Sequence, residues 1–202
     1  MRRLILVWLL PLLVADQALK FYIKLNFLAS QPGYPGTQVD LIPGILELVF
    51  IENKGMAFGW ALPGVAGKLL LTSFRIIAAV VIGLYLSKLV KEKAHKGLLV
   101  CVTLIWAGAI GNIIDGAFYG LIFTESVSGP FATAASLSLD GYAPLFMGKV
   151  VDMFHFVLRW PSWIPFEGEI FPPIWNISDA AISISVIWII IRQGVFFRSN
   201  ED

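Results

Sequence analysis

Residues 98–119 read LLVCVTLIWAGAIGNIIDGAFY, a stretch whose one charged side chain is Asp115. A helix needs about 20 mostly apolar residues to cross the hydrocarbon core of a bilayer, so this stretch predicts a membrane span. Three other stretches have the same character. The predicted spans are residues 4–23, 69–90, 98–119 and 177–197.

The composition of the whole chain supports lipid as its solvent. Hydrophobic residues make up 57% of the 202 residues and charged residues 14%, whereas soluble domains carry about 25% charged residues. The net charge of +1 gives no indication of a nucleic-acid partner. We predict an all-α membrane protein, one domain over residues 1–202, with a small extracytoplasmic β-sheet region.

The start of the chain looks like a signal peptide, because Arg2 and Arg3 precede an apolar run. That run ends in Asp16-Gln17 without a small-x-small cleavage site, and apolar residues resume after it. We therefore expect the first span to be retained.

Basic residues predict the orientation, because cytoplasmic loops are enriched in Lys and Arg. They gather before the first span, between the second and third spans, and at the end of the fourth. We expect both termini in the cytoplasm and residues 25–67 and 120–175 outside. The residues concerned are Arg2, Arg3, Lys88, Lys91, Lys93, Lys96, Arg192 and Arg198.

The two outer segments differ in character. Residues 45–52 are rich in β-formers, with Pro43-Gly44 before them and Asn53-Lys54-Gly55 after them, which predicts a strand in a small sheet on the outer membrane surface. Residues 126–141 are rich in Ser, Ala and Gly and predict a flexible loop or insertion.

Four aspartates fall at one predicted depth. Asp16 and Asp115 lie near the outer ends of the first and third spans, and Asp179 lies at the outer start of the fourth. Asp152 lies in the apolar outer stretch 150–154. Ionisable groups within membrane spans are energetically expensive and are therefore candidates for function.

Each acid alone has a structural explanation. Asp179 could cap its helix, and Asp16 could mark where the first span leaves the lipid. Asn112 and Asp115 lie one turn apart on one helix face and could make a polar contact between helices. The set of four, rather than any one of them, indicates chemistry.

Two carboxylates held close together cannot both ionise easily, so one can activate a water while the other donates a proton. Such hydrolysis needs no metal and no cofactor, and His95 and His155 lie far apart with no cysteine nearby, unlike usual zinc ligands. A Ser/Lys dyad would need Ser126 or Ser128 with Lys149, and these serines lie in the low-complexity segment.

Two functions from other classes stay open on the residues alone. A small proton-coupled transporter could use intramembrane acids as a relay, although the acids gather at one face and no inverted repeat is visible. A non-enzymatic scaffold would need no acids in its spans.

Motifs along nearly the whole chain resemble the lipoprotein signal peptidase (signal peptidase II) family. They occur in the family's order, and the four predicted spans fall in the right places. The matching segments are Asp16-Gln17, Asn53-Lys54-Gly55-Met56-Ala57-Phe58, Gly108 with Gly111-Asn112-Ile113-Ile114-Asp115, Val150-Val151-Asp152-Met153 and Asn176-Ile177-Ser178-Asp179-Ala180.

The resemblance implies a membrane aspartic endopeptidase that cuts bacterial prolipoproteins on the N-terminal side of a diacylglyceryl-modified cysteine. It implies that the protein lies in the bacterial inner membrane, with its active site at the outer face and its substrate surrounded by membrane lipid. The resemblance does not indicate an oligomeric state. Asp152 and Asp179 would be the catalytic pair. The expected supporting or substrate-binding residues are Asp16, Asn53, Gly55, Asn112, Asp115 and Asn176.

The chain departs from the family pattern beside Asp115. The family usually has Arg directly after this acid, whereas this chain has Gly116. Another cation could take that place. Among Lys149, Arg159, Lys20 and Arg75 we predict Lys149, because it lies just before the Asp152 segment.

Overall fold

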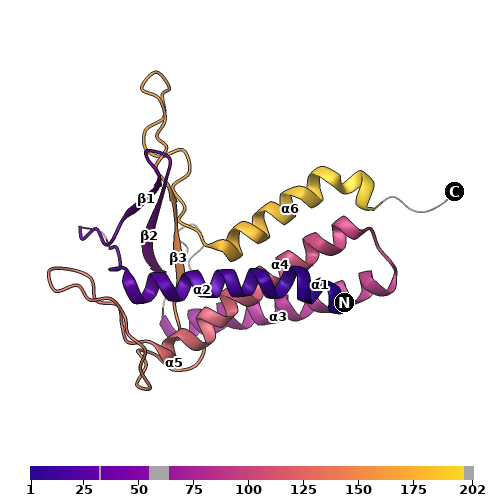
Figure 1. The fold of residues 1–202 in the computed structure, drawn as a ribbon, viewed down its shortest axis with the longest axis horizontal. Coiled ribbons are helices and arrows are strands. Elements are labelled where there is room, and N and C mark those ends of the chain that lie inside the picture. Colours follow the sequence, from indigo (N-terminus) through magenta and orange to yellow (C-terminus); the bar gives the residue numbers. More distant parts are fainter. Residues whose placement is uncertain (32, 55–63, 198–202) are drawn as a thin grey trace. The chain divides into compact units, whose positions relative to one another are not determined.

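The computed structural model describes residues 1–31, 33–54 and 64–197 (Figure 1). Within this part of the chain, four helices are long and apolar enough to cross a membrane, which confirms the four predicted spans. They are Arg2–Asn26, Gly64–Lys91, Lys96–Ile122 and Ile177–Phe196.

The chain forms two compact units, each built from separate stretches of sequence. The first contains residues 1–17, 70–114 and 177 onward, and the second contains residues 18–69 and 115–176. That residues 1–202 form a single domain stays a prediction.

The first unit is helical. It contains α1 (Arg2–Leu4), the π-helical η1 (Ile5–Leu9) and the start of α2 (Leu10–Asn26), most of α3 (Gly64–Lys91), α4 (Lys96–Ile114) and α6 (Ile177–Phe196). Its apolar core is formed by the end of α3, the start of α4 and the end of α6. The buried members are Leu86, Leu89, Leu98, Cys101, Val102 and Phe196.

The helices of this unit also expose large apolar side chains. Phe74 and Leu84 on α3 and Ile184 and Ile191 on α6 are each about two-thirds exposed. Such surfaces are unfavourable in water and suit contact with lipid tails. The exposure therefore agrees with helices that lie in a bilayer.

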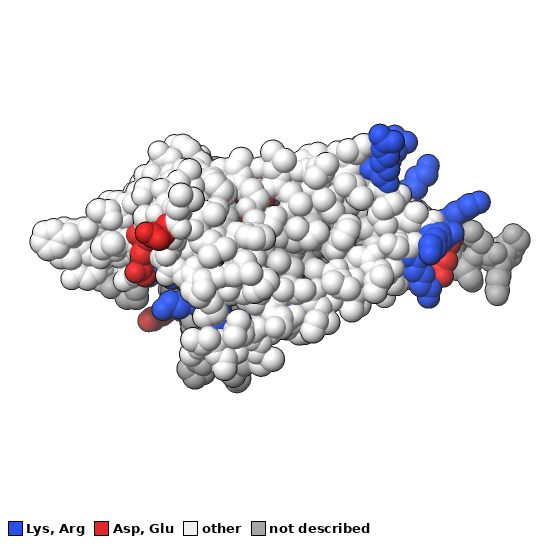
Figure 2. Space-filling view, turned by 90° about the horizontal axis from the view of Figure 1, so that it is seen from below, with Lys and Arg blue, Asp and Glu red and all other residues white. Residues whose placement is uncertain are grey.

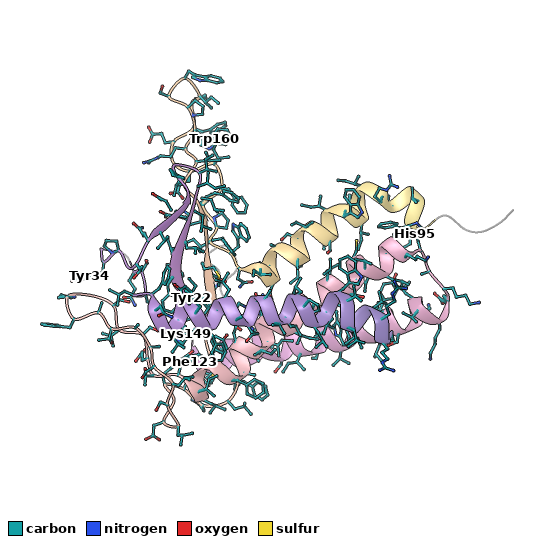
Figure 3. All side chains as sticks on the ribbon, viewed as in Figure 1. Tyr22, Tyr34, His95, Phe123, Lys149 and Trp160 are labelled. Atoms are coloured by element: carbon teal, nitrogen blue, oxygen red, sulfur yellow. The ribbon has the colours of Figure 1, made fainter. Side chains whose placement is uncertain are left out.

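Basic residues gather at one end of this unit. Figure 1 shows the N-terminus, the turn between α3 and α4 and the last turn of α6 at the same end. Figure 2 shows a group of Lys and Arg side chains there, beside a long surface that shows little charge. At this end His95 lies against Phe196, with ring centroids 5.0 Å apart (Figure 3).

The second unit contains a three-stranded antiparallel sheet in the order β1 (Val39–Ile42), β2 (Leu46–Asn53), β3 (Val150–Phe156). The predicted strand at 45–52 is β2. A turn joins it to β1, with Pro43 and Gly44 at its centre and a bond from the Ile45 amide to the Ile42 carbonyl. Gly44 has φ +73°, a conformation that favours glycine.

The segments that flank the sheet are paired along their backbones. The short helices η2 (Asp115–Tyr119) and α5 (Gly120–Ile122) lead into a hairpin in which Phe123 pairs with Leu137 and Val127 with Thr133. The stretch predicted as a flexible loop is thus a hairpin over most of its length. A second hairpin, bridged between Arg159 and Glu169, carries Trp160 beyond the end of β3 (Figure 3).

Candidate active site

Asp152 lies on β3 and is buried, with 3% of its surface exposed. The Asn53 side-chain amide donates to Oδ2 at 3.0 Å, and the Asn176 amide donates to Oδ1 at 2.7 Å. An ionised carboxylate only accepts hydrogen bonds. The two amides therefore hold Asp152 in one orientation, ready to act as an acceptor.

Asn176 is held against β3 by the residue before it. The Trp175 backbone exchanges two hydrogen bonds with Phe154, at 2.8 and 3.0 Å, and their rings stack at 4.7 Å. The fully buried Asn176 amide also donates to the Val151 carbonyl at 3.3 Å. Strand pairing thus positions this amide beside Asp152.

Asp115 is fully buried and pairs with Lys20 of α2, which is also fully buried, at 2.8 Å. Its Oδ2 also accepts from the Val151 amide of β3 at 3.3 Å. Lys149 instead contacts Glu52 at 2.7 Å and Glu125 at 3.5 Å. The prediction that Lys149 replaces the family's arginine is therefore wrong, because α2 brings Lys20 to this position.

Asp179 belongs to the first unit, in the first turn of α6. It is half-buried, and the Asn112 amide of α4 donates to its Oδ1 at 2.8 Å. Asn112 is itself buried. This acid, like Asp152, is therefore oriented by an asparagine.

Asp16, on α2, contacts the start of the same helix α6. Its Oδ1 accepts from the Ser178 backbone amide at 3.0 Å, and its Oδ2 accepts from Gln17 at 3.2 Å. The first amides of a helix have no partner within the helix and favour negative charge. Asp16 therefore braces the turn that carries Asp179.

The predicted residues form two groups. Asp152, Asn53, Asn176 and Asp115 lie in the second unit, and Asp179, Asn112 and Asp16 lie in the first. The pairing of Asp152 with Asp179 stays a prediction. Gly55 lies outside the described residues.

Sequence reasoning did not identify a buried cluster around Glu52. Lys24 and Lys149 both contact its carboxylate, and Ser126 lies between Lys24 and Glu52, donating to Glu52 at 3.1 Å. Ser126 is thus partnered by Lys24 rather than by Lys149. One signal was available: Lys20 and Lys24 follow Asp16 at intervals of four, which places all three on one helix face.

A second group that the sequence did not reveal surrounds His155 on β3. Its ring nitrogens lie 2.8 Å from Glu47 and 3.0 Å from Glu169. Burial lowers the pKa of His155, but the hydrogen bonds to the two glutamates outweigh it, and the net pKa is raised. Within residues 1–31, 33–54 and 64–197, no group of three or more His, Cys, Asp or Glu side chains could hold a metal ion.

A family model described as "Signal peptidase (SPase) II" matches residues 8–195. The lipoprotein signal peptidase of Porphyromonas gingivalis strain W83 is 40% identical over 190 residues, which cover 89% of this chain and 78% of that protein. That of Amoebophilus asiaticus is 35% identical over 187 residues, covering 89% and 73%.

Two solved structures, both titled as bacterial membrane enzymes obtained by the in meso method, share the fold. The one at 2.3 Å resolution has a TM-score of 0.63 and 21% identity and covers all of this chain and 94% of its own. The one at 1.9 Å has a TM-score of 0.61 and 24% identity and covers 96% and 93%.

Proposed function

This chain belongs to the signal peptidase II family, and from that premise we propose that Asp152 and Asp179 are its catalytic pair. The chain is a multi-pass membrane peptidase that removes signal peptides from prolipoproteins. The transporter alternative finds no support in these comparisons. The observation that carries the proposal is that each acid is oriented by an asparagine amide, Asp152 by Asn53 and Asn176, and Asp179 by Asn112.

The chemistry follows from two carboxyl groups that share a proton. The ionised member takes a proton from a water molecule, whose oxygen attacks the carbonyl carbon of the scissile bond. The protonated member donates its proton to the carbonyl oxygen, which gives a neutral tetrahedral intermediate. When this intermediate collapses, the C–N bond breaks and the departing nitrogen takes up the proton that the first carboxyl received from the water. One hydroxyl of the intermediate returns its proton to the other carboxylate, which re-forms the C=O bond and restores the shared proton of the pair.

The remaining residues support the pair in this proposal. Asn53, Asn112 and Asn176 orient the carboxylates, and Asp16 braces the turn before Asp179. Asp115 with Lys20 holds the Val151 amide, next to Asp152. Gly55 lies outside the described residues; the family motif implies that its turn would place the outer sheet over the peptide.

The substrate is proposed to be cut on the N-terminal side of its diacylglyceryl-modified cysteine. A lipidated peptide stays in the bilayer, so its cleavage site reaches the headgroup level. The proposed location is the bacterial inner membrane, with both termini cytoplasmic and the site at the outer face. The basic residues at one end of the helical unit support this orientation (Figure 2).

Substitution of each acid by its amide tests the pair. Asp152→Asn and Asp179→Asn should each lower cleavage of a diacylglyceryl prolipoprotein peptide by about 10²–10⁴-fold, because neither amide can carry the shared proton. Asp140→Asn, at an exposed aspartate, is the matched control and should cleave as the parent chain does. Near-normal turnover by either site variant, in correctly inserted protein, would refute the assignment.

A further inference from the structure

A buried charge network surrounds Glu52, the residue before Asn53 on β2. The Glu52 side chain is 9% exposed and uses both carboxylate oxygens. Lys24 and Ser126 contact Oε1, and Lys149 contacts Oε2 at 2.7 Å. Lys24 also donates to the Ser126 hydroxyl at 3.2 Å.

The network joins four segments of the second unit. Lys24 lies near the end of α2, and Glu52 lies on β2. Ser126 lies in the first hairpin, and Lys149 directly precedes β3. Figure 3 labels Lys149, and the Lys149 ammonium lies 5.0 Å from the Tyr142 ring centroid.

Aromatic rings complete the surroundings of Lys24. Its ammonium lies 5.2–5.6 Å from the ring centroids of Phe50, Phe123 and Tyr142. A cation at such distances from a ring face is attracted to it, more strongly when water is excluded. The fully buried Lys24 is thus held by the rings, by the Ser126 hydroxyl and by the Glu52 carboxylate, and the Asp115 charge also acts on it.

The sheet register places this network directly behind the catalytic acid. Glu52 pairs with Val151 across β2 and β3, and Ile51 pairs with Asp152. Successive side chains of a strand point to opposite faces. Glu52 therefore lies on one face of the sheet, while Asn53 and Asp152 meet on the other, at a distance of 3.0 Å.

Glu52 is the carboxylate that balances two ammonium groups here. Burial raises the pKa of Glu52, but Lys24 and Lys149 outweigh this, and the net pKa is lowered. The other acid in contact with Lys149 is Glu125, which is 68% exposed and lies at 3.5 Å. Without the Glu52 charge, Lys24 and Lys149 would repel each other with little screening.

We propose that Glu52 is a positioning residue, which with Lys24 and Lys149 holds the adjoining ends of β2 and β3 so that Asn53 can donate to Asp152. Lys149 directly precedes β3, so its ion pair with Glu52 joins the ends of β2 and β3, and the Lys24–Glu52 pair ties this end of β2 to α2. Loss of the Glu52 charge would remove both pairs and leave Lys24 to repel Lys149. The inference rests on the proposed catalytic role of Asp152.

The experiment measures the pH dependence of kcat/KM for the full chain, with a diacylglyceryl prolipoprotein peptide as substrate. In Glu52→Gln the acidic limb should move to higher pH by about half a unit or more, because a carboxylate that loses an amide donor holds its proton more tightly. Among the described residues, Lys24 and Lys149 are the charged groups that contact Glu52, and Glu125 lies beyond Lys149. Asp115 acts on Lys24, and the Tyr142 hydroxyl also faces the Glu52 charge. Glu125→Gln is the matched control and should leave the limb in place.

Lys149→Met keeps the Lys24–Glu52 pair, so it should shift the acidic limb of the pH profile in the same direction but by less. If Glu52→Gln does not fold, the Lys149→Met variant tests the proposal in its place. If the folded variants kept the acidic limb at the pH of the parent chain, the proposal would be overturned. Asp152→Asn is measured alongside. Its activity would refute the catalytic assignment, whereas an inactive Asp152→Asn with unshifted Glu52→Gln would refute the positioning role alone.

Discussion

Lys20 and Asp115 form an ion pair in which neither side chain is exposed to solvent. Removing one partner of such a pair leaves the other charge buried and uncompensated, which costs about 3–5 kcal/mol. We therefore predict that Lys20→Met lowers the free energy of unfolding by that amount, measured by denaturation in detergent.

The matched control is Lys88→Met, because Lys88 in the last turn of α3 and Glu92 directly after that helix form an exposed pair at 3.7 Å. Such surface pairs contribute about 0.3–0.5 kcal/mol, so this variant should unfold nearly as the parent chain does. Adding Asp115→Asn to Lys20→Met should restore part of the loss. Equal stability of Lys20→Met and the control would contradict a structural role for the buried pair.

At the scale of residues, the sequence indicates which acids are candidates for function, but it does not indicate which side chains pair with them. Asp152 and Asp179 stand out because charges in apolar stretches are rare. The cation beside Asp115 could not be chosen from the sequence, because residues 20 and 115 meet only after α2 and η2 have packed. Closeness along the chain favoured Lys149, but folding placed Lys149 beside Glu52.

Helices α4 and α6 pack closely where α4 carries glycines. A β-carbon at Gly108 would lie 2.5 Å from the Ser178 carbonyl oxygen, and one at Gly111 would overlap the Ser178 hydroxyl and lie 2.8 Å from Asp16 Oδ2. Small residues allow helices to approach closely in membranes. This packing brings Asn112 within 2.8 Å of Asp179.

Gly111→Ala should therefore destabilise the chain by about 1–3 kcal/mol, as expected for overpacking, and should lower cleavage because Asp16 and Ser178 must move. Thermal unfolding in detergent and the peptide assay measure the two effects. Gly194→Ala on α6 is the control, because a β-carbon there meets no atom within 4 Å. If Gly111→Ala matched this control in both measurements, the close packing would have no functional role.

At the scale of elements, hydropathy located all four spans, but the first three helices extend beyond the predicted bounds, the second furthest at its start. Helix α3 begins at Gly64 rather than at residue 69, because a helix can extend beyond the apolar run that marks its lipid-crossing part. Strand β3 was visible only as an apolar stretch. Its strand character comes from pairing with β2, a contact between residues about 100 positions apart that no local pattern encodes.

For the whole molecule, the family motifs predict which residues carry the chemistry, and the structure shows the contacts that those residues make. Asn176 donates to Asp152, Asn112 donates to Asp179, and Asp16 contacts the first turn of α6. The supporting roles of these residues stay predictions. The Glu52 network has no motif, because its lysines, serine and glutamate come from four separated segments. Such clusters depend on the complete fold of the second unit.

The orientation of the whole chain is testable by cysteine labelling. The native Cys101 is buried, so a Cys101→Ala background carries one new thiol at a time. In intact cells, a membrane-impermeant maleimide should label Ser136→Cys in the first hairpin and should not label Lys93→Cys in the turn between α3 and α4. Both positions are exposed, so permeabilised cells should label both and serve as the control.

The physical reason for this expectation is the distribution of charge rather than its total. The net charge is only +1, yet Lys91 ends α3, Lys93 lies in the α3–α4 turn and Lys96 begins α4. This turn lies at the same end of the helical unit as the N-terminus, which carries Arg2 and Arg3 (Figure 1). Short loops rich in Lys and Arg are retained in the cytoplasm during insertion. Labelling of position 93 from outside intact cells would reverse the orientation and place the acids on the cytoplasmic side, where a signal peptide that has crossed the membrane could not reach them.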